Sequence, residues 1–239
     1  MKKQTPVFDK YVSDYRGIHT QNIHNVSGVD SAYFCEFKLK LLEQDGVIPK
    51  KGGKWLDFGC GDGSSAEYIT KHYPEYEYIG LDISTVSLEV ADKRYGGKYR
   101  FISYDGVNMP FEDDSFDVIY LACVLHHIEP EDRPHIIREL LRIIKPGGKI
   151  VIFEHNPYNP LTRKVVHDCI FDEGVKLVKP GRLIKYLKNN NVKTDLYYSI
   201  FFPRKKLFKG MLKYERRLSR CPLGGQYYLY AEKENKAGE

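Results

Sequence analysis

Apolar and polar positions along the middle of this chain form two alternating kinds of block. Short, nearly continuous apolar runs predict strands over 54–58, 76–82, 100–103, 117–121 and 149–154. Longer segments with apolar residues at helical spacing predict helices over 64–72, 84–95 and 130–144. Ser84 is the expected N-cap of the second helix. This alternation predicts an α/β fold, a doubly wound and mostly parallel sheet with helices on both faces.

The two ends of the chain are less regular. A helix is expected over 31–42, in a polar and aromatic N-terminal segment. Later residues predict a short helix over 182–188 and strands over 196–202 and 226–231. Between these strands, 204–220 is predicted to be one basic amphipathic helix that sits over one end of the sheet. Its expected apolar side consists of Leu207, Phe208, Met211, Leu212 and Leu218.

The segment 55–65 carries the most specific pattern in the chain. An apolar strand ends near Asp57, and glycines at three alternate positions, 59, 61 and 63, precede the next helix. Such a turn lets the backbone pass close to a nucleotide-like ligand at a helix N-terminus. Asp82 ends the next strand, where an acid accepts hydrogen bonds from ribose hydroxyls. Together these features predict a site for a nucleoside cofactor.

The glycines alone do not identify this cofactor, because Gly61, Gly63 and Ala66 also fit a looser dinucleotide fingerprint. Asp57 separates the two cases. A carboxylate at the loop repels a pyrophosphate, whereas it favours a cofactor that carries an ammonium and a sulfonium group. The pattern therefore favours S-adenosylmethionine over NAD. An NAD-linked oxidoreductase and a catalytically silent binding module remain as alternatives.

Four segments, in order, resemble the class I S-adenosylmethionine-dependent methyltransferases, whose fold is Rossmann-like. They are 56–63, 81–84, 105–111 and 116–128 with 141–148, so that the resemblance covers about 54–155. It implies a seven-stranded sheet with an antiparallel last strand, and a methyltransferase domain over 46–239 that contains the basic insertion 204–220. It also implies cofactor contacts by Asp57, Gly59, Gly61, Asp62, Gly63, Asp82, Ile83, Asp105, Gly106, Leu121 and Ala122.

Residues 1–45 are expected to form a lid over this cofactor, with Tyr11 or Tyr15 near its methionine end. The candidate catalytic residues follow strands, where ligands of open α/β sheets bind. They are His126 and His127 after the fourth strand, and Glu154 and His155 after the fifth. Methyl transfer needs a base only when the acceptor must lose a proton, so a packing role is the alternative for each residue. Imidazole and carboxylate are typical metal ligands, so these four residues could form a metal site. No metal is expected, since nothing in the reaction requires one.

Charge is unevenly distributed along the chain. The net charge is +5, yet 160–220 holds 16 Lys and Arg residues against 5 Asp and Glu residues. This excess predicts contact with an anion, or a solvated basic face. Resemblances at 154–160, Phe202-Pro203 and 221–227 point to a bacterial subgroup linked to surface polysaccharide and sugar-nucleotide biosynthesis. We therefore expect a small anionic acceptor such as a nucleotide sugar or a glycan intermediate.

RNA or another small molecule is the alternative acceptor. Nucleic acid is not favoured, because Asn156-Pro157-Tyr158 follows the fifth strand and lacks the second proline of the Asn-Pro-Pro-Tyr signature. The N-terminus has no apolar signal region, 118–125 is too short to span a bilayer, and the five cysteines predict free thiols. We therefore expect a cytoplasmic protein. The methylated atom and the oligomeric state are left open.

Overall fold

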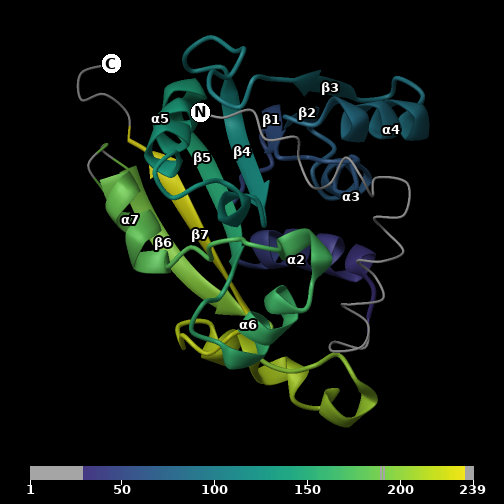
Figure 1. Ribbon diagram of the computed structural model, residues 1–239, viewed down its shortest axis with the longest axis vertical. Helices are drawn as coiled ribbons and strands as arrows, with labels where there is room; N and C mark the ends of the chain where they lie inside the picture. The colour runs from purple at the N-terminus through teal and green to yellow at the C-terminus, as the bar shows by residue number, and fades with distance from the viewer. Residues whose placement is uncertain (1–28, 189, 191, 235–239) are drawn as a thin grey trace.

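The computed structural model describes residues 29–188, 190 and 192–234. Seven strands in this part of the chain form one sheet with the order β3-β2-β1-β4-β5-β7-β6 (Figure 1). Their bounds are β1 Gly53–Phe58, β2 Tyr76–Asp82, β3 Arg100–Ser103, β4 Phe116–Ala122, β5 Ile144–His155, β6 Val192–Ser199 and β7 Gln226–Lys233. Strand β7 runs antiparallel to both of its neighbours, and the other pairs are parallel. The predicted fold class is confirmed.

Helices cover both faces of the sheet because side chains of successive strand residues point to opposite faces. In β1, Leu56 and Phe58 belong to one buried cluster and Trp55 to the other. Helices α5 and α7 pack into the first cluster, and α2 and α3 pack into the second (Figure 1). The helices are α2 Ser31–Gln44, α3 Ala66–His72, α4 Thr85–Tyr95, α5 Arg133–Ile143, α6 Pro160–His167 and α7 Pro180–Lys188.

The predicted single helix over 204–220 is wrong. Two 3-10 segments, η4 Lys206–Phe208 and η5 Leu212–Leu218, take its place, with Gly210 between them. Leu207 is 85% exposed and Met211 is 43% exposed, so the expected apolar face is not buried. Ion pairs such as Arg204 with Glu215 hold this segment instead. Its expected place is confirmed, since it lies beyond one end of the sheet between β6 and β7 (Figure 1).

Several other helices and strands differ from those predicted from the sequence. Helix α6 was not predicted; Asn159 caps it by accepting a hydrogen bond from the Thr162 amide, and Pro160 is its first residue. Strand β5 begins at Ile144, ahead of the Pro146-Gly147-Gly148 turn that the pattern placed before it, and its pairing with β4 shifts register there. Strand β6 begins and ends earlier than predicted.

Of the two expectations for the N-terminal segment, the structure tests the helix but not the lid. The predicted helix is present as α2, whose Leu39 and Leu42 pack beside Trp55 against the sheet. Tyr11 and Tyr15 lie outside the described residues, so the lid itself stays a prediction. Among the helices of the described residues, none is both long and apolar enough to cross a bilayer.

Candidate cofactor and acceptor site

One cavity of about 740 Å³ opens at the carboxyl ends of the parallel strands. Its walls include residues that directly follow β1, β2, β4 and β5, together with the N-terminal half of α2 and the segment after β6. Open α/β sheets bind their ligands at this edge. Of the predicted site residues, the wall contains Gly59, Gly61, Asp62, Asp82, Ile83, Ala122, His126, His127 and His155.

The backbone conformation and close packing of the turn after β1 require its glycines. Gly59, Gly61 and Gly63 have φ values of 74°, 52° and 70°, which side-chain-bearing residues rarely adopt. A Cβ on Gly59 would lie 2.6 Å from a methyl group of Val124. At Gly61 the space around a Cβ is open, and the residue lines the cavity. The turn therefore offers bare backbone to a ligand, as a cofactor cradle requires.

Asp82 ties this turn to the start of α4. Its Oδ2 accepts a hydrogen bond from the Gly61 amide at 2.8 Å, and its Oδ1 accepts one from the Ser84 amide at 2.9 Å. Asp82 also lines the cavity, so its carboxylate is within reach of a ligand there. Ser84 accepts from the Ser87 amide, which confirms the predicted helix cap. The geometry fits a ribose at Asp82.

Asp62 and Asp57 have structural partners. Asp62 is buried, pairs with Arg94 at 2.7 Å and accepts a hydrogen bond from the Ser64 amide. Asp57 lies under the turn, where its carboxylate accepts the Tyr78 hydroxyl at 2.9 Å, and it is not among the residues that line the cavity. Desolvation by burial raises the pKa of Asp57 to about 7. Asp57 can therefore affect a bound cation through its charge rather than through contact.

The remaining predicted cofactor residues do not line the cavity. Gly63, Leu121, Asp105 and Gly106 are not among the lining residues, although Tyr104 is. The Asp105 carboxylate accepts the amides of Val107 and Asn108, both at 2.8 Å, so it organises the loop after β3. Contact between these residues and a cofactor stays a prediction.

The four candidate catalytic residues meet in one cluster. Nδ1 of His126 lies 2.6 Å from Oε2 of Glu154, whose Oε1 accepts the Leu125 amide at 2.7 Å. The rings of His126 and His155 are 5.1 Å apart. Glu154 is fully buried and is not among the lining residues, whereas the histidines line the cavity. The candidates are thus neighbours, and three of them face the ligand space.

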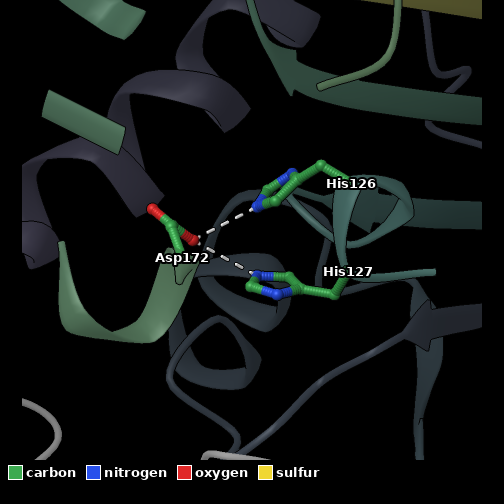
Figure 2. Close-up of side chains that lie close together, drawn as sticks. All are labelled: His126, His127 and Asp172. Atoms are coloured by element: carbon green, nitrogen blue, oxygen red, sulfur yellow. Dashed lines mark ion pairs between the residues drawn. The ribbon is translucent and has the colours of Figure 1, made fainter. Parts of the chain in front are cut away.

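Asp172 completes this cluster and was missed by the sequence analysis. It belongs to the short segment η3 Ile170–Asp172, and its Oδ1 lies 3.5 Å from Nε2 of both His126 and His127 (Figure 2). No motif marks it. The available signal was that Asp172 is one of the few acids in the basic stretch 160–220.

Burial and neighbouring charges set the protonation of the cluster. Burial disfavours a charged His126, but the carboxylates of Glu154 and Asp172 outweigh it and raise the pKa of His126 to about 10. Burial and the charge of His126 lower the pKa of His127 to about 3 and that of His155 to about 4. The pKa of Asp172 falls to about 2, because His126 outweighs the effect of burial. A charged imidazole thus lies between two carboxylates, beside two neutral imidazoles.

The other half of the cavity wall combines apolar and polar side chains. Its apolar side chains include Phe34, Leu161, Val165, Phe171, Phe201 and Phe202. Three cationic side chains, those of Lys38, Lys176 and Arg204, also line it. Two of them are paired, Lys176 with Glu129 and Arg204 with Glu215, each at 2.7 Å. The lysines at 205, 206 and 209 are not among the lining residues, so the basic segment borders the cavity through Arg204 and the residues just before it.

Comparisons with known proteins agree with this geometry. Residues 56–152, less than half of the chain, match the family model described as a methyltransferase domain. The chain is 34% identical over 148 residues to a demethylmenaquinone methyltransferase from Clavibacter sepedonicus, covering 60% of this chain and 56% of that protein. The chain thus spans about half the length of the curated relatives it matches.

Two solved structures share the fold. One is an S-adenosylmethionine-dependent methyltransferase from Thermotoga maritima, a possible histamine N-methyltransferase, with a TM-score of 0.68 at 18% identity over 95% of this chain and 98% of that one. The other is Haemonchus contortus phosphoethanolamine N-methyltransferase 2 in complex with S-adenosylmethionine. Its TM-score is 0.64 at 18% identity, and the match covers 95% of this chain and 57% of that one. The comparisons support the predicted enzyme class and cofactor. The polysaccharide subgroup stays a prediction.

Proposed function

We propose that this chain is an S-adenosylmethionine-dependent methyltransferase whose acceptor is a small molecule with an apolar body. One observation carries the proposal. The glycine turn with Asp82, and the apolar side chains with the histidines, line the same cavity. A volume of about 740 Å³ lies within the range of small-molecule sites. Cofactor and acceptor would therefore share one space, as transfer between them requires.

The chain's own residues divide the work of binding and alignment. The backbone of the glycine turn would pass along the cofactor, and the carboxylate of Asp82 would accept its ribose hydroxyls. When bound, the cofactor supplies a methyl group activated by a sulfonium. The apolar side chains of the wall would exclude water and hold the acceptor in line, which is most of what this displacement needs. His127 and His155 would orient the accepting group by hydrogen bonding.

The acceptor class is inferred from the wall and from the relatives. Several aromatic and aliphatic side chains line the half of the cavity opposite the glycine turn, beside polar ones. They would pack against a ring or chain, such as that of a reduced quinone, and a curated relative is named for demethylmenaquinone. The cationic side chains on this wall are the support for a second candidate, the small anionic acceptor, although acids line the cavity too, among them Asp30, Glu129, Asp172 and Glu173. Lys38 lines the cavity together with Arg204, although Arg204 already pairs with Glu215.

Release of S-adenosylhomocysteine from the purified chain tests the proposal. The acceptors to compare are reduced quinones with short prenyl chains, nucleotide sugars and a short RNA. We expect turnover with a reduced quinone and at least tenfold less with the others. Preference for nucleotide sugars would transfer the proposal to the anionic class. Lack of turnover with every acceptor, in protein that binds S-adenosylmethionine, would contradict the acceptor proposal and leave the cofactor assignment standing.

A further inference from the structure

We propose that His126, His127 and Asp172 form a binding site for a divalent first-row transition metal ion, with Zn²⁺ as the probe. Figure 2 shows the three side chains converging, the histidines from η2 Leu125–His127 and the aspartate from η3. The site does not depend on the methyl transfer proposed above. It rests on three observations: the spacing of the ligand atoms, the partner of His126, and the position of the cluster on the cavity wall.

The spacing of the ligand atoms fits a bound ion. Oδ1 of Asp172 lies 3.5 Å from Nε2 of each histidine, and one ligand atom from each residue lies within 4.8 Å of the other two. Zinc binds nitrogen and oxygen at about 2.0–2.1 Å, which puts tetrahedral ligand atoms about 3.4 Å apart. One ion could therefore reach Asp172 and both histidines, provided that it displaces the proton that the charged His126 carries on Nε2. At 3.5 Å these contacts are longer than good hydrogen bonds.

Glu154 holds His126 as a metal ligand would be held. Oε2 of Glu154 lies 2.6 Å from Nδ1, which leaves Nε2 directed at Asp172. Metal-ligating histidines commonly donate their other nitrogen to a carboxylate, which fixes ring orientation and raises ligand basicity. Glu154 is fully buried and is itself fixed by the Leu125 amide. This supporting contact would be in place before a metal arrives.

The donor set and the surroundings define the class of ion. Two imidazoles and one carboxylate suit zinc, iron or nickel, whereas calcium and magnesium prefer oxygen ligands. All three residues line the cavity, so an ion would keep an open coordination position toward the ligand space. A water or an acceptor oxygen could occupy that position. A bound ion would thus supply a Lewis acid on the histidine side of the cavity.

A purely structural ion network is the competing explanation, and His127 separates the two. In such a network His126 bridges Glu154 and Asp172, and His127 adds a contact with Asp172, at 3.5 Å. A metal site needs His127 as its third ligand. His167 supplies a matched control, because its side chain is 88% exposed and belongs to α6, outside the cluster.

The test is Zn²⁺ binding to the full chain after treatment with a chelator, measured by calorimetry and by competition with a chromogenic chelator. We expect one Zn²⁺ per chain, with at least about tenfold weaker binding for H127A and D172N and unchanged binding for H167A. Thermal melts would confirm that each variant is folded, and H127N provides a milder second change. Absent stoichiometric Zn²⁺ binding, or equal affinity in H127A, H127N and H167A, would overturn the proposal. Neither cofactor nor acceptor is present, so this failure leaves the methyltransferase proposal untouched.

Discussion

The two halves of the cavity are built by different means. The half around the glycine turn is made by loops that directly follow adjacent strands, and backbone hydrogen bonds hold it. Gly59 and Cys60 both donate to the Leu81 carbonyl, and Asp82 accepts the Gly61 amide. The opposite half is made by side chains from distant segments, as where Asp172 meets His126. Backbone geometry thus specifies one half, and side-chain identity specifies the other. This division suits an enzyme class that keeps one cofactor and varies its acceptor.

The largest loss of stability should follow from removing Glu154, the buried acid in the half of the cavity that side chains from distant segments build. Replacing Glu154 by Ala leaves the Leu125 amide and the charged His126 without their partner. Loss of one member of a buried pair costs about 3–5 kcal/mol of unfolding free energy. Urea unfolding would measure it, with Glu131→Ala as the exposed control. A loss no greater than that of the control would show that this cluster does not hold the acceptor half together.

A substitution at Gly59 should destabilise the half of the cavity that the glycine turn builds. In Gly59→Ala the new Cβ meets Val124 at 2.6 Å and sits at a strained positive φ, with a cost of about 1–3 kcal/mol for the backbone strain alone. Gly46→Ala is the matched control, since Gly46 also has a positive φ but open space around it. Urea unfolding of both variants separates clash from strain. Equal losses would mean that Val124 yields and that Gly59 is needed for its φ only.

The affinity for S-adenosylmethionine should depend on Asp82. We expect Asp82→Ala to weaken S-adenosylmethionine binding by about 1–3 kcal/mol, because ribose hydroxyls lose their acceptor and the Gly61 amide loses its partner. Calorimetry measures this, with Asp92→Ala on the exposed side of α4 as the control. Unchanged affinity in Asp82→Ala would show that the ribose lies elsewhere.

The smallest effect is a pH dependence from Asp57. Its pKa in the folded chain, about 7, lies above the ordinary 3.8, so folding favours the protonated acid. The stabilisation is complete below pH 4 and is lost as the pH rises through 7. Relative to Asp57→Asn, the natural chain should lose about 1 kcal/mol between pH 6 and pH 7, measured by urea unfolding. A constant difference between the two chains across this range would contradict a pKa near 7 for Asp57 in the folded chain.

The same division explains what could be predicted from the sequence. The glycine turn, Asp82 and the cap at Ser84 depend on residues a few positions apart, so local patterns reveal them. The pairing of His126 with Glu154 was within reach, because His126 follows β4 and Glu154 lies at the end of the adjacent parallel strand β5.

The missed features depend on distant partners. Asp172 lies in an irregular segment with no periodicity, and only the packed chain brings it to the histidines. The amphipathic pattern of 204–220 predicted a helix, but Gly210 interrupts it and Glu215 anchors it through Arg204 and two backbone amides. Long-range side-chain pairs of this kind leave no local signature.

The central claim is that the backbone half of this cavity binds S-adenosylmethionine. Calorimetric titration of S-adenosylmethionine, S-adenosylhomocysteine and NAD into the full chain tests it most directly. The account predicts one site per chain with micromolar affinity for the first two and no heat of binding for NAD. Binding of NAD, or absence of binding by both sulfur compounds, would contradict it.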